Sequence, residues 1–272
     1  MKKLTNEKLK QVELNLLIEI DKICREHGWR YSLGAGTLIG AIRHRGFIPW
    51  DDDIDIMMPR TDYDQLIAHI NSHVYDFGVI TCENNKYYQD IFAKVYDKNT
   101  IIVESVGNTD LTNLGVFVDI FPIEGLGENE KQAKHNAKKG KLLHLILTCA
   151  GMKKYSKSTN LSVLYEPIRF LVYCCTRNSN ANRIANKLDC MYKKIDFDKS
   201  EYVGTTSGSF KERTVLKRKE YTEFCEVDFE GHKFLSIKAY DKYLKNCYGD
   251  YMVLPPEERR VSHHTFEAYW KD

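Results

Sequence analysis

The sequence lacks the features that define several large classes of protein. No apolar run approaches the ~18 residues needed to span a bilayer, and the opening MKKLTNEKLK has no apolar core of a secretion signal. The eight cysteines form no C-x-x-C pair and no zinc-like cluster, which is typical of proteins in a reducing compartment. The net charge is only +2, too small a basic excess for a nucleic-acid footprint. We therefore expect a cytoplasmic protein with no nucleic-acid partner.

What the sequence does contain predicts a globular fold that mixes helices and strands. Apolar residues make up 43% and charged residues 29% of the 272 positions, close to the averages for globular proteins. Apolar residues that recur at three- and four-residue steps predict a helix over 5–27 that stops at Gly28. Further helices are expected at 38–44, from Thr61 onward, and at 128–150, 161–176, 180–195 and 238–247. Strands are expected at 30–33, between Pro49 and Pro59, and at 91–96, 100–104 and 115–121, with a hairpin at 226–237. The fold class is thus α/β (α+β), with a mixed core over 1–125 and a helical region with a C-terminal cap over 126–272.

The segment WDDDIDIMM concentrates four carboxylates within five residues. If it forms a strand, Asp51, Asp53 and Asp55 share one face, while isoleucines on the other face anchor the core. Asp53 and Asp55 would then lie about 7 Å apart, close enough for their carboxyl groups to converge on one cation. Carboxylates side by side repel one another without a cation, which favours a metal site over a solvated acidic turn. An EF-hand is excluded because the required Gly and Glu are missing at the sixth and twelfth positions.

A third carboxylate, Asp119, lies within the apolar segment GVFVDIFP. An ionised carboxylate in such a strand costs several kcal/mol unless a cation or hydrogen bonds compensate it. On a strand beside the acidic one, Asp119 would bind the same metal, accept a proton from an attacking hydroxyl, or do both. The alternative is a structural aspartate that caps a turn before Pro122.

Possible anion-binding groups flank the acidic segment. The turn Gly34-Ala35-Gly36-Thr37 precedes a predicted helix, so its free backbone N–H groups can face an anion, although it is no Walker A loop. Arg43 and His44 follow in the same stretch, and they are candidate substrate-binding residues. Lys94, inside the strand IFAKVY, is either an edge-strand charge or a phosphate ligand.

The segment GAGTLIGAIRHRGFIPWDDDIDI at 34–56 closely resembles the LicD family of phosphotransferases, which includes phosphocholine transferases and is related to the fukutin-related protein. The resemblance continues through GVFVDIFP and the C-terminal YGDYMVLPPEERR, while the region from about 128 to 235 carries little that matches. It implies a nucleotidyltransferase-type fold in which Asp53, Asp55 and Asp119 serve as catalytic and metal-binding residues, with Mg²⁺ or Mn²⁺ as cofactor. Gly36 and Thr37 would contact the phosphates of the donor.

The family's activity implies transfer of a phospho-alcohol, most simply phosphocholine from CDP-choline, to a sugar hydroxyl of a lipid-linked cell-surface glycan precursor. Teichoic acid, capsule and lipopolysaccharide are the candidate glycans. Ribitol- or glycerol-phosphate from another CDP-alcohol is an alternative, as is true nucleotidyl transfer from an NTP. A non-catalytic nucleotide-binding protein is the alternative from a different class.

Two further features of the sequence leave alternatives open. The apolar segments 138–150 and 163–175 are either ordinary core or an interfacial face for peripheral contact with the inner surface of a membrane. His263 and His264 are adjacent near the C-terminus, where histidines are usually solvated, and an acceptor contact is their other possible role.

Overall fold

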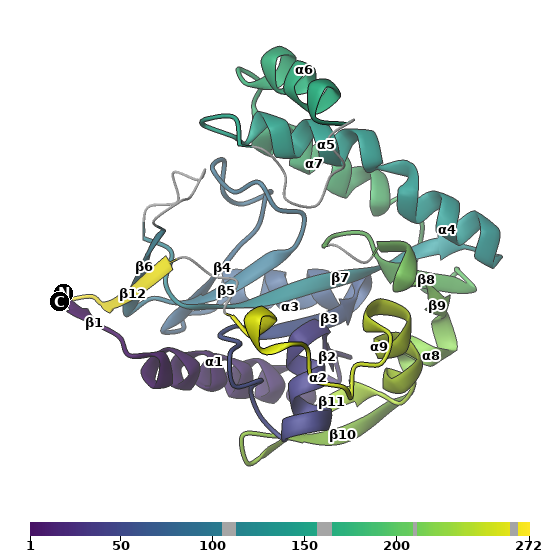
Figure 1. Ribbon diagram of the computed structural model, residues 1–272. Coiled ribbons are helices and arrows are strands. Elements are labelled where there is room, and N and C mark those ends of the chain that lie inside the picture. The colour runs from purple at the N-terminus through teal and green to yellow at the C-terminus, as the bar shows by residue number, and fades with distance from the viewer. Residues whose placement is uncertain (105–112, 157–164, 209–210, 262–265) are drawn as a thin grey trace.

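The computed structural model describes residues 1–104, 113–156, 165–208, 211–261 and 266–272, which form a mixed α/β fold (Figure 1). A twisted central sheet is covered by helices, and the two chain ends lie next to each other (Figure 1). The expected fold class is therefore confirmed.

The first helix shows how closely the sequence pattern can predict an element. Helix α1 spans Asn6–His27; the Thr5 hydroxyl accepts a hydrogen bond from the backbone N–H of Lys8, and Gly28 ends the helix with φ of 69°. The leucine and isoleucine positions that recur along the helix are buried, as expected. The predicted helix over 5–27 is confirmed.

The central sheet holds the strands that carry the acidic motif. Its order is β2-β3-β7-β5-β4, and β8 pairs with both β7 and β9. Strands β3 and β7 run parallel, whereas the other printed pairs of this sheet are antiparallel. Their bounds are β2 Ser32–Leu33, β3 Asp55–Pro59, β4 Phe77–Ile80, β5 Ala93–Asp97, β7 Phe117–Gly127, β8 Tyr202–Thr205 and β9 Leu216–Lys217.

Two smaller sheets complete the strand pairing. In one, β12 (Phe266–Trp270) lies between β1 (Lys2–Lys3) and β6 (Thr100–Glu104), so the two chain termini pair with each other. In the other, β10 (Phe224–Phe229) and β11 (His232–Ile237) form the hairpin expected near 226–237.

The helices between Glu130 and Tyr192 gather at the top and upper right of the molecule, whereas those at Arg218–Thr222 and Tyr240–Tyr248 lie lower, at the right (Figure 1). The helix predicted over 128–150 is interrupted at Gly140, where an added Cβ would come within 2.3 Å of the Tyr192 hydroxyl oxygen. The helices expected at 38–44, from Thr61 onward and at 238–247 are confirmed to within a few residues, and the one expected at 180–195 is shorter than predicted. The helix expected at 161–176 is described only from Glu166, and the short helix at Arg218–Thr222 was not predicted. The bounds of these helices are α2 Ala35–His44, α3 Arg60–Ser72, α4 Glu130–Lys139, α5 Lys141–Ala150, α6 Glu166–Thr176, α7 Ala181–Tyr192, α8 Arg218–Thr222 and α9 Tyr240–Tyr248.

Residues after 125 contribute directly to the core built by residues before it. One hydrophobic cluster runs from Leu14 in α1 through Ile56 in β3 to Tyr251, and β8 extends the central sheet. The division at about residue 125 stays a prediction, and the two segments share both sheet and core.

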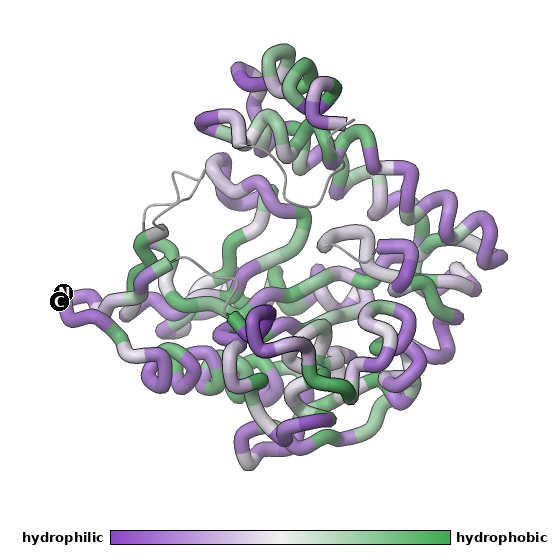
Figure 2. The backbone as a smooth tube through the Cα atoms, viewed as in Figure 1, coloured by the Kyte–Doolittle hydropathy of each residue, from purple (hydrophilic) through white to green (hydrophobic). Residues whose placement is uncertain are grey.

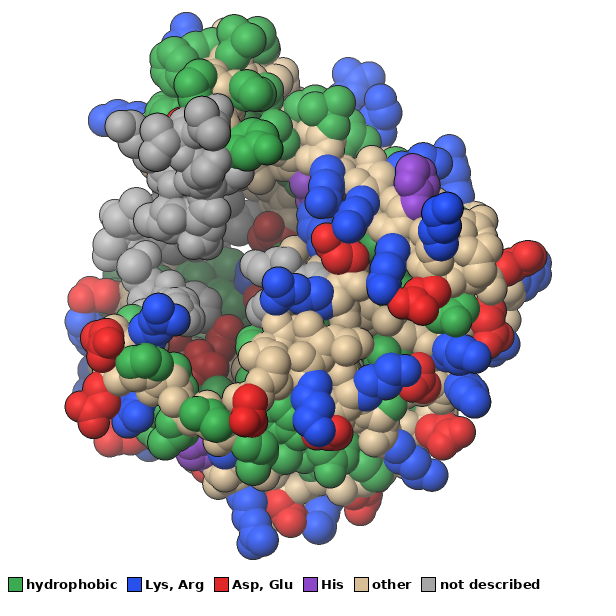
Figure 3. All heavy atoms as spheres, turned by 45° about the vertical axis from the view of Figure 1, so that its right-hand side comes forward, with side chains coloured by type: hydrophobic (Ala, Val, Ile, Leu, Met, Phe, Trp, Pro, Cys, Tyr) green, Lys and Arg blue, Asp and Glu red, His purple; other side chains and the backbone are tan. Residues whose placement is uncertain are grey.

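Helix α6 presents apolar side chains to solvent. The exposed fractions of Ile168, Phe170 and Leu171 are 55%, 50% and 64%. The backbone at the top of the molecule, where α6 lies, includes hydrophobic stretches coloured green (Figure 2), and hydrophobic side chains gather on the surface at that end (Figure 3). For residues 163–175 we expected either ordinary core or an interfacial face. The exposure of these three side chains does not fit ordinary core. Across the parts of the chain that the structure describes, no helix is both long and apolar enough to cross a membrane.

Candidate active site

The acidic segment follows the alternation that the sequence predicts, although only its second half is a paired strand. Strand β3 begins at Asp55, so the strand expected from Pro49 to Pro59 is shorter than predicted. Ile54 and Ile56 are fully buried in the core. Asp51, Asp53 and Asp55 line an open pocket of about 390 Å³, and Asp52 does not line it. The extended backbone separates odd from even residues even where strand pairing has not begun.

Asp119 lies directly beside Asp55. The parallel pairing of β3 with β7 places the two residues opposite each other in register. On the other side of β7, Lys94 of β5 is paired with Asp119, and its Nζ lies 2.6 Å from Oδ1 of that carboxylate. The expectation that Asp119 lies on the strand next to the acidic segment is confirmed. Lys94 proves to be the ion-pair partner of Asp119, and its role as a phosphate ligand stays a prediction.

The carboxyl groups of the site raise one another's proton affinity. The pKa of Asp55 lies well above its usual range because of burial first, then the charges of Asp53 and Asp119, with Lys94 opposing the shift. Carboxylates held together in this way are stabilised by a bound cation, which offsets both the burial cost and the repulsion. Since all these donors are oxygens, the chemistry fits Mg²⁺ or Mn²⁺ better than zinc.

The carboxylates that would hold a metal are neighbours, but their carboxyl groups do not converge on one point. As the side chains stand, no three His, Cys, Asp or Glu side chains in the described ranges are arranged around a single point that could hold an ion. Asp53 and Asp55 share the pocket wall, and Asp119 is next to Asp55 with Oδ1 engaged by Lys94. A divalent ion would therefore be held by Asp53 and Asp55, with Asp119 turning toward it, and the metal assignment stays a prediction.

The Gly-rich stretch that was expected to be a turn is the first turn of helix α2. Gly34 precedes the helix, which starts at Ala35, so the backbone N–H groups of its first turn have no partner within the helix. Gly36 allows close approach of the acidic segment, since an added Cβ would lie 2.6 Å from Oδ2 of Asp51. The Thr37 hydroxyl accepts a hydrogen bond of 2.8 Å from the backbone N–H of Asp55 and so holds the start of β3. Contacts of Gly36 and Thr37 with donor phosphates stay predictions.

Of the two basic residues at the end of α2, only Arg43 lines the pocket. Its Nη1 donates a hydrogen bond of 2.6 Å to the carbonyl oxygen of Tyr251, and burial lowers the pKa of its guanidinium. His44 packs edge-on against Trp50, and burial and Arg43 lower its pKa. Substrate binding by either residue stays a prediction.

The opposite wall of the pocket comes from the C-terminal segment, which sequence reasoning did not place there. Tyr248, Asp250 and Tyr251 line the pocket together with Trp50 and the odd-numbered aspartates. The pKa of the Tyr248 hydroxyl is raised by burial first and by carboxylates that include Asp55, which shows how closely the segment approaches the acidic strand. The YGDY motif was visible in the sequence, but a gap of almost 200 residues separates it from the acidic motif.

Glu13 is a second residue that sequence reasoning missed. It lies on the buried face of α1 with 2% of its surface exposed, and its Oε2 atom has no hydrogen-bond partner. Its pKa is raised well above the usual value by burial first, then by Asp53, Asp52 and Asp119. The signal was a glutamate four residues after Leu9 and four before Leu17, on the apolar stripe of the helix.

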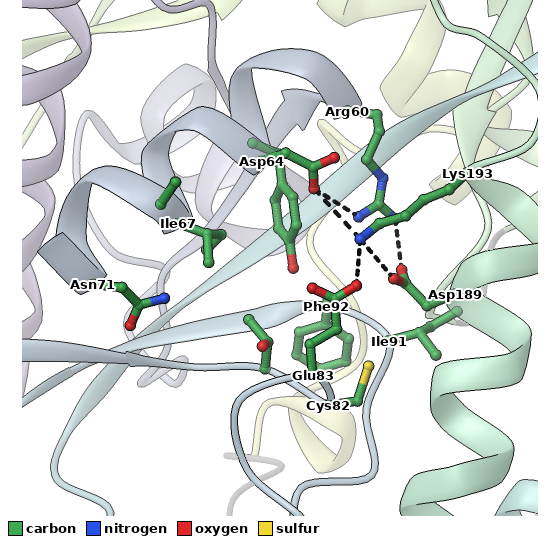
Figure 4. A pocket seen from close by; sticks show the side chains of 13 residues that line it. Arg60, Asp64, Ile67, Asn71, Cys82, Glu83, Ile91, Phe92, Asp189 and Lys193 are labelled. Carbon is green, nitrogen blue, oxygen red and sulfur yellow. Dashed lines mark hydrogen bonds and ion pairs between the residues drawn. The ribbon is translucent and has the colours of Figure 1, made fainter.

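A second pocket, of about 370 Å³, lies between α3, α7 and the segments 81–83 and 91–92, and its charged side chains form a network of ion pairs (Figure 4). Arg60 forms ion pairs with Asp64 and Asp189, and Lys193 forms ion pairs with Asp64, Glu83 and Asp189 (Figure 4). Arg60 also forms an ion pair with Glu124 of β7. Buried ion pairs that are mutually satisfied act as structural cross-links. This network joins α3 to β7 and α7, and each of its carboxylates has a cationic partner.

Comparison with known proteins agrees with this geometry. Over 273 aligned residues, 30% are identical to the lipopolysaccharide cholinephosphotransferase LicD of Haemophilus influenzae (strain ATCC 51907 / DSM 11121 / KW20 / Rd), covering 99% of each chain. The family described as LicD/FKTN/FKRP, nucleotidyltransferase domain, matches residues 28–141. The chain belongs to the LicD family. It is an enzyme of that family, as the sequence motif indicated.

Part of the chain also matches a protein of another organism. An uncharacterized protein of Rickettsia prowazekii (strain Madrid E), RP689, is 28% identical over 116 residues, which cover 40% of this chain and 44% of that protein. The match to the LicD family model ends at residue 141, yet the C-terminal segment that closes the pocket lies at 248–255. His263 and His264, for which an acceptor contact was considered, lie outside the described residues.

Proposed function

We propose that this protein transfers phosphocholine from CDP-choline to a sugar hydroxyl of a cell-surface glycan precursor and releases CMP. The observation that carries the proposal is the pairing of Asp55 with Asp119 at a pocket wall shared with Asp53, in a chain that matches a cholinephosphotransferase over its full length. Because the donor is a nucleotide conjugate, we expect the reaction to take place in the cytoplasm.

In the proposed reaction the acceptor hydroxyl oxygen attacks the distal phosphorus of the donor. The bond from that phosphorus to the bridging oxygen breaks, CMP leaves with the bond's electron pair, and phosphocholine remains on the acceptor. Asp119, held by Lys94, accepts the proton of the attacking hydroxyl. Arg43 and the N-terminal turn of α2 bind the oxygens of the diphosphate.

The carboxylates of the pocket require a partner cation for this chemistry. Asp53 and Asp55 would hold Mg²⁺ or Mn²⁺, which when bound would neutralise the diphosphate and the departing CMP. Thr37 supports this arrangement by holding the backbone of Asp55, which fixes where its carboxyl group emerges from the sheet.

The same carboxylates would also serve a nucleotidyltransferase that attacks the α-phosphate of an NTP, so product analysis must separate the two reactions. The protein is incubated with an amino-sugar glycan and, in parallel, CDP-choline, CDP-ribitol, CDP-glycerol or CTP. We expect stoichiometric CMP and a glycan heavier by one phosphocholine, with CDP-choline the preferred donor. Pyrophosphate from CTP with nucleotide on the acceptor would refute the proposal, and no transfer with binding alone would indicate a non-catalytic protein. Preference for another CDP-alcohol would retain the reaction class and change the alcohol.

We place the acceptor on a lipid carrier, with α6 as the membrane contact. Helix α6 packs against α5, and Lys141 in α5 and Lys153 and Lys154 in the segment after it are exposed. Exposed apolar side chains together with lysines suit the surface of an anionic bilayer. Sedimentation with phosphatidylglycerol vesicles should carry the protein down, and a Phe170→Asp, Leu171→Asp variant should stay in the supernatant. Equal sedimentation of both proteins would remove α6 from this role.

A further inference from the structure

The pocket at the acidic segment is unusually rich in groups that attract a cation. Its lining includes four carboxyl groups, from Asp51, Asp53, Asp55 and Asp250, against one guanidinium, from Arg43. The remaining wall carries three aromatic side chains and otherwise apolar groups. The excess of carboxylates in this lining favours a cationic group over an uncharged polyhydroxyl group such as ribitol or glycerol.

One aromatic side chain of the pocket, Trp50, already has a cationic group over its ring. The guanidinium carbon of Arg260 lies 5.5 Å from the centre of the Trp50 ring, within the range of a cation–π contact. Trp50 is half-buried and packs against the main core cluster, so its ring is held in place next to Asp51. Arg260 shows that the indole face can be approached by a positive group from this side of the molecule.

The other aromatic residues of the pocket, Tyr248 and Tyr251, belong to a C-terminal segment that is held by hydrogen bonds to distant parts of the chain. Arg43 donates to the carbonyl oxygens of Tyr251 and Val253, and the Tyr251 hydroxyl donates to Asp241 at 3.0 Å. Helix α9 ends at Tyr248, and Gly249 turns the chain with φ of 73° so that Asp250 follows at the pocket. These contacts hold the segment that carries Tyr248 and Asp250 in the pocket that Trp50 also lines.

We propose that Trp50, Tyr248 and Asp250 bind the trimethylammonium group of the donor, and that they give this enzyme its preference for choline. The inference rests on the proposed function, because only two carbons and one oxygen separate that nitrogen from the distal phosphorus. A phosphorus beside Asp53 and Asp55 therefore places the ammonium in the same pocket. Aromatic faces bind quaternary ammonium by cation–π attraction, and the Asp250 carboxylate adds a long-range charge.

The test compares CDP-choline with the CDP ester of 3,3-dimethylbutanol. In this analogue a carbon atom replaces the quaternary nitrogen, which keeps the shape of the choline group and removes its positive charge. Binding is measured by isothermal titration, and turnover by CMP release. Wild-type protein should bind CDP-choline at least about tenfold more tightly, as expected for a desolvated cation on an aromatic ring. Tyr248→Leu and Trp50→Leu should each lose most of this preference, measured as the ratio of the dissociation constants of the analogue and of CDP-choline. The matched Tyr248→Phe control keeps the ring and should retain the preference.

Asp250→Asn provides a variant at an exposed position that does not threaten folding, and it should lower the ratio by about two- to fivefold, the range of a partly screened charge. Equal binding of both donors by wild-type protein, or an unchanged ratio in Tyr248→Leu, Trp50→Leu and Asp250→Asn, would overturn the subsite. CMP release from CDP-choline would continue in that case, and the proposed function would stand. If instead the ratio follows the prediction but no CMP is released, the subsite stands and the proposed reaction fails.

Discussion

Replacing Asp55 by Asn should separate the stability of the protein from its activity. Asp55 lies opposite Asp119 on the neighbouring strand, and neighbouring strands are about 4.8 Å apart. Two unit charges 5–7 Å apart repel by roughly 2–3 kcal/mol at an effective dielectric constant of 20. Lys94, paired with Asp119, offsets part of this repulsion, so we expect Asp55→Asn to stabilise the metal-free protein by about 1–2 kcal/mol.

The same substitution should abolish the response to metal. A gain of 1–2 kcal/mol corresponds to a rise of roughly 2–6 °C in the midpoint of thermal unfolding for a chain of this size. Added Mn²⁺ or Mg²⁺ at 100 times its dissociation constant should stabilise wild-type protein by about 2.7 kcal/mol and leave Asp55→Asn almost unchanged. Turnover should fall by about 1,000-fold or more, because a metal ligand contributes several kcal/mol to transition-state stabilisation.

The assay is a thermal melt with and without metal, followed by CMP release from the same preparations. Asp53→Asn should behave like Asp55→Asn, and Asp52→Asn is the matched control because its side chain does not line the pocket. A metal-free Asp55→Asn protein that melts below wild type, or one that retains turnover in its soluble fraction, would refute the reasoning. Equal loss of activity in all three variants would indicate a general acidic patch.

Three further predictions address the same cluster of side chains. Exhaustive chelation with EDTA should stop CMP release, and Mg²⁺ or Mn²⁺ should restore it, since oxygen ligands favour hard cations; full activity after chelation would exclude the metal. Asp119→Asn should depress turnover strongly with little change in the thermal midpoint, whereas near-normal turnover would leave Asp119 only its structural pairing with Lys94. Glu13 and Asp55 have raised pKa values in the fold, so the folded protein holds these protons more tightly than the unfolded chain. The contribution of these two carboxyl groups to the stability of the metal-free protein should therefore be fully present below their usual values of 4.5 and 3.8 and be lost as pH rises through the raised values; Glu13→Gln should remove its part of that pH dependence, and an unchanged dependence in denaturant titrations would contradict the assignment.

Local chemistry determined the elements that sequence reasoning placed correctly. The three- and four-residue spacing of apolar side chains, a threonine cap and a terminal glycine were sufficient for α1. Alternation around Ile54 and Ile56 was sufficient to predict which aspartates face the pocket, even though the strand itself starts only at Asp55. Both features depend on the geometry of a few consecutive residues.

The errors arose where a long-range contact overrode a local signal. The stretch from Gly34 to Thr37 reads as a turn, but it enters helix α2 because the acidic segment packs against Gly36 and hydrogen-bonds to Thr37. The helix predicted over 128–150 divides at Gly140 because the Tyr192 hydroxyl lies against that glycine. Neither partner is identifiable from the residues next to the break.

The sequence alone indicated the LicD family and the acidic segment of the pocket, because the motif at 34–56 is continuous and its alternation is local. Only the tertiary structure decided which carboxylates are neighbours, since the register of β3 with β7 sets Asp55 against Asp119. Only the tertiary structure brought Glu13 beneath the acidic segment and Tyr248 across from it. These contacts join residues far apart in the chain, and they depend on the packing of helices on the sheet, which local periodicity does not specify.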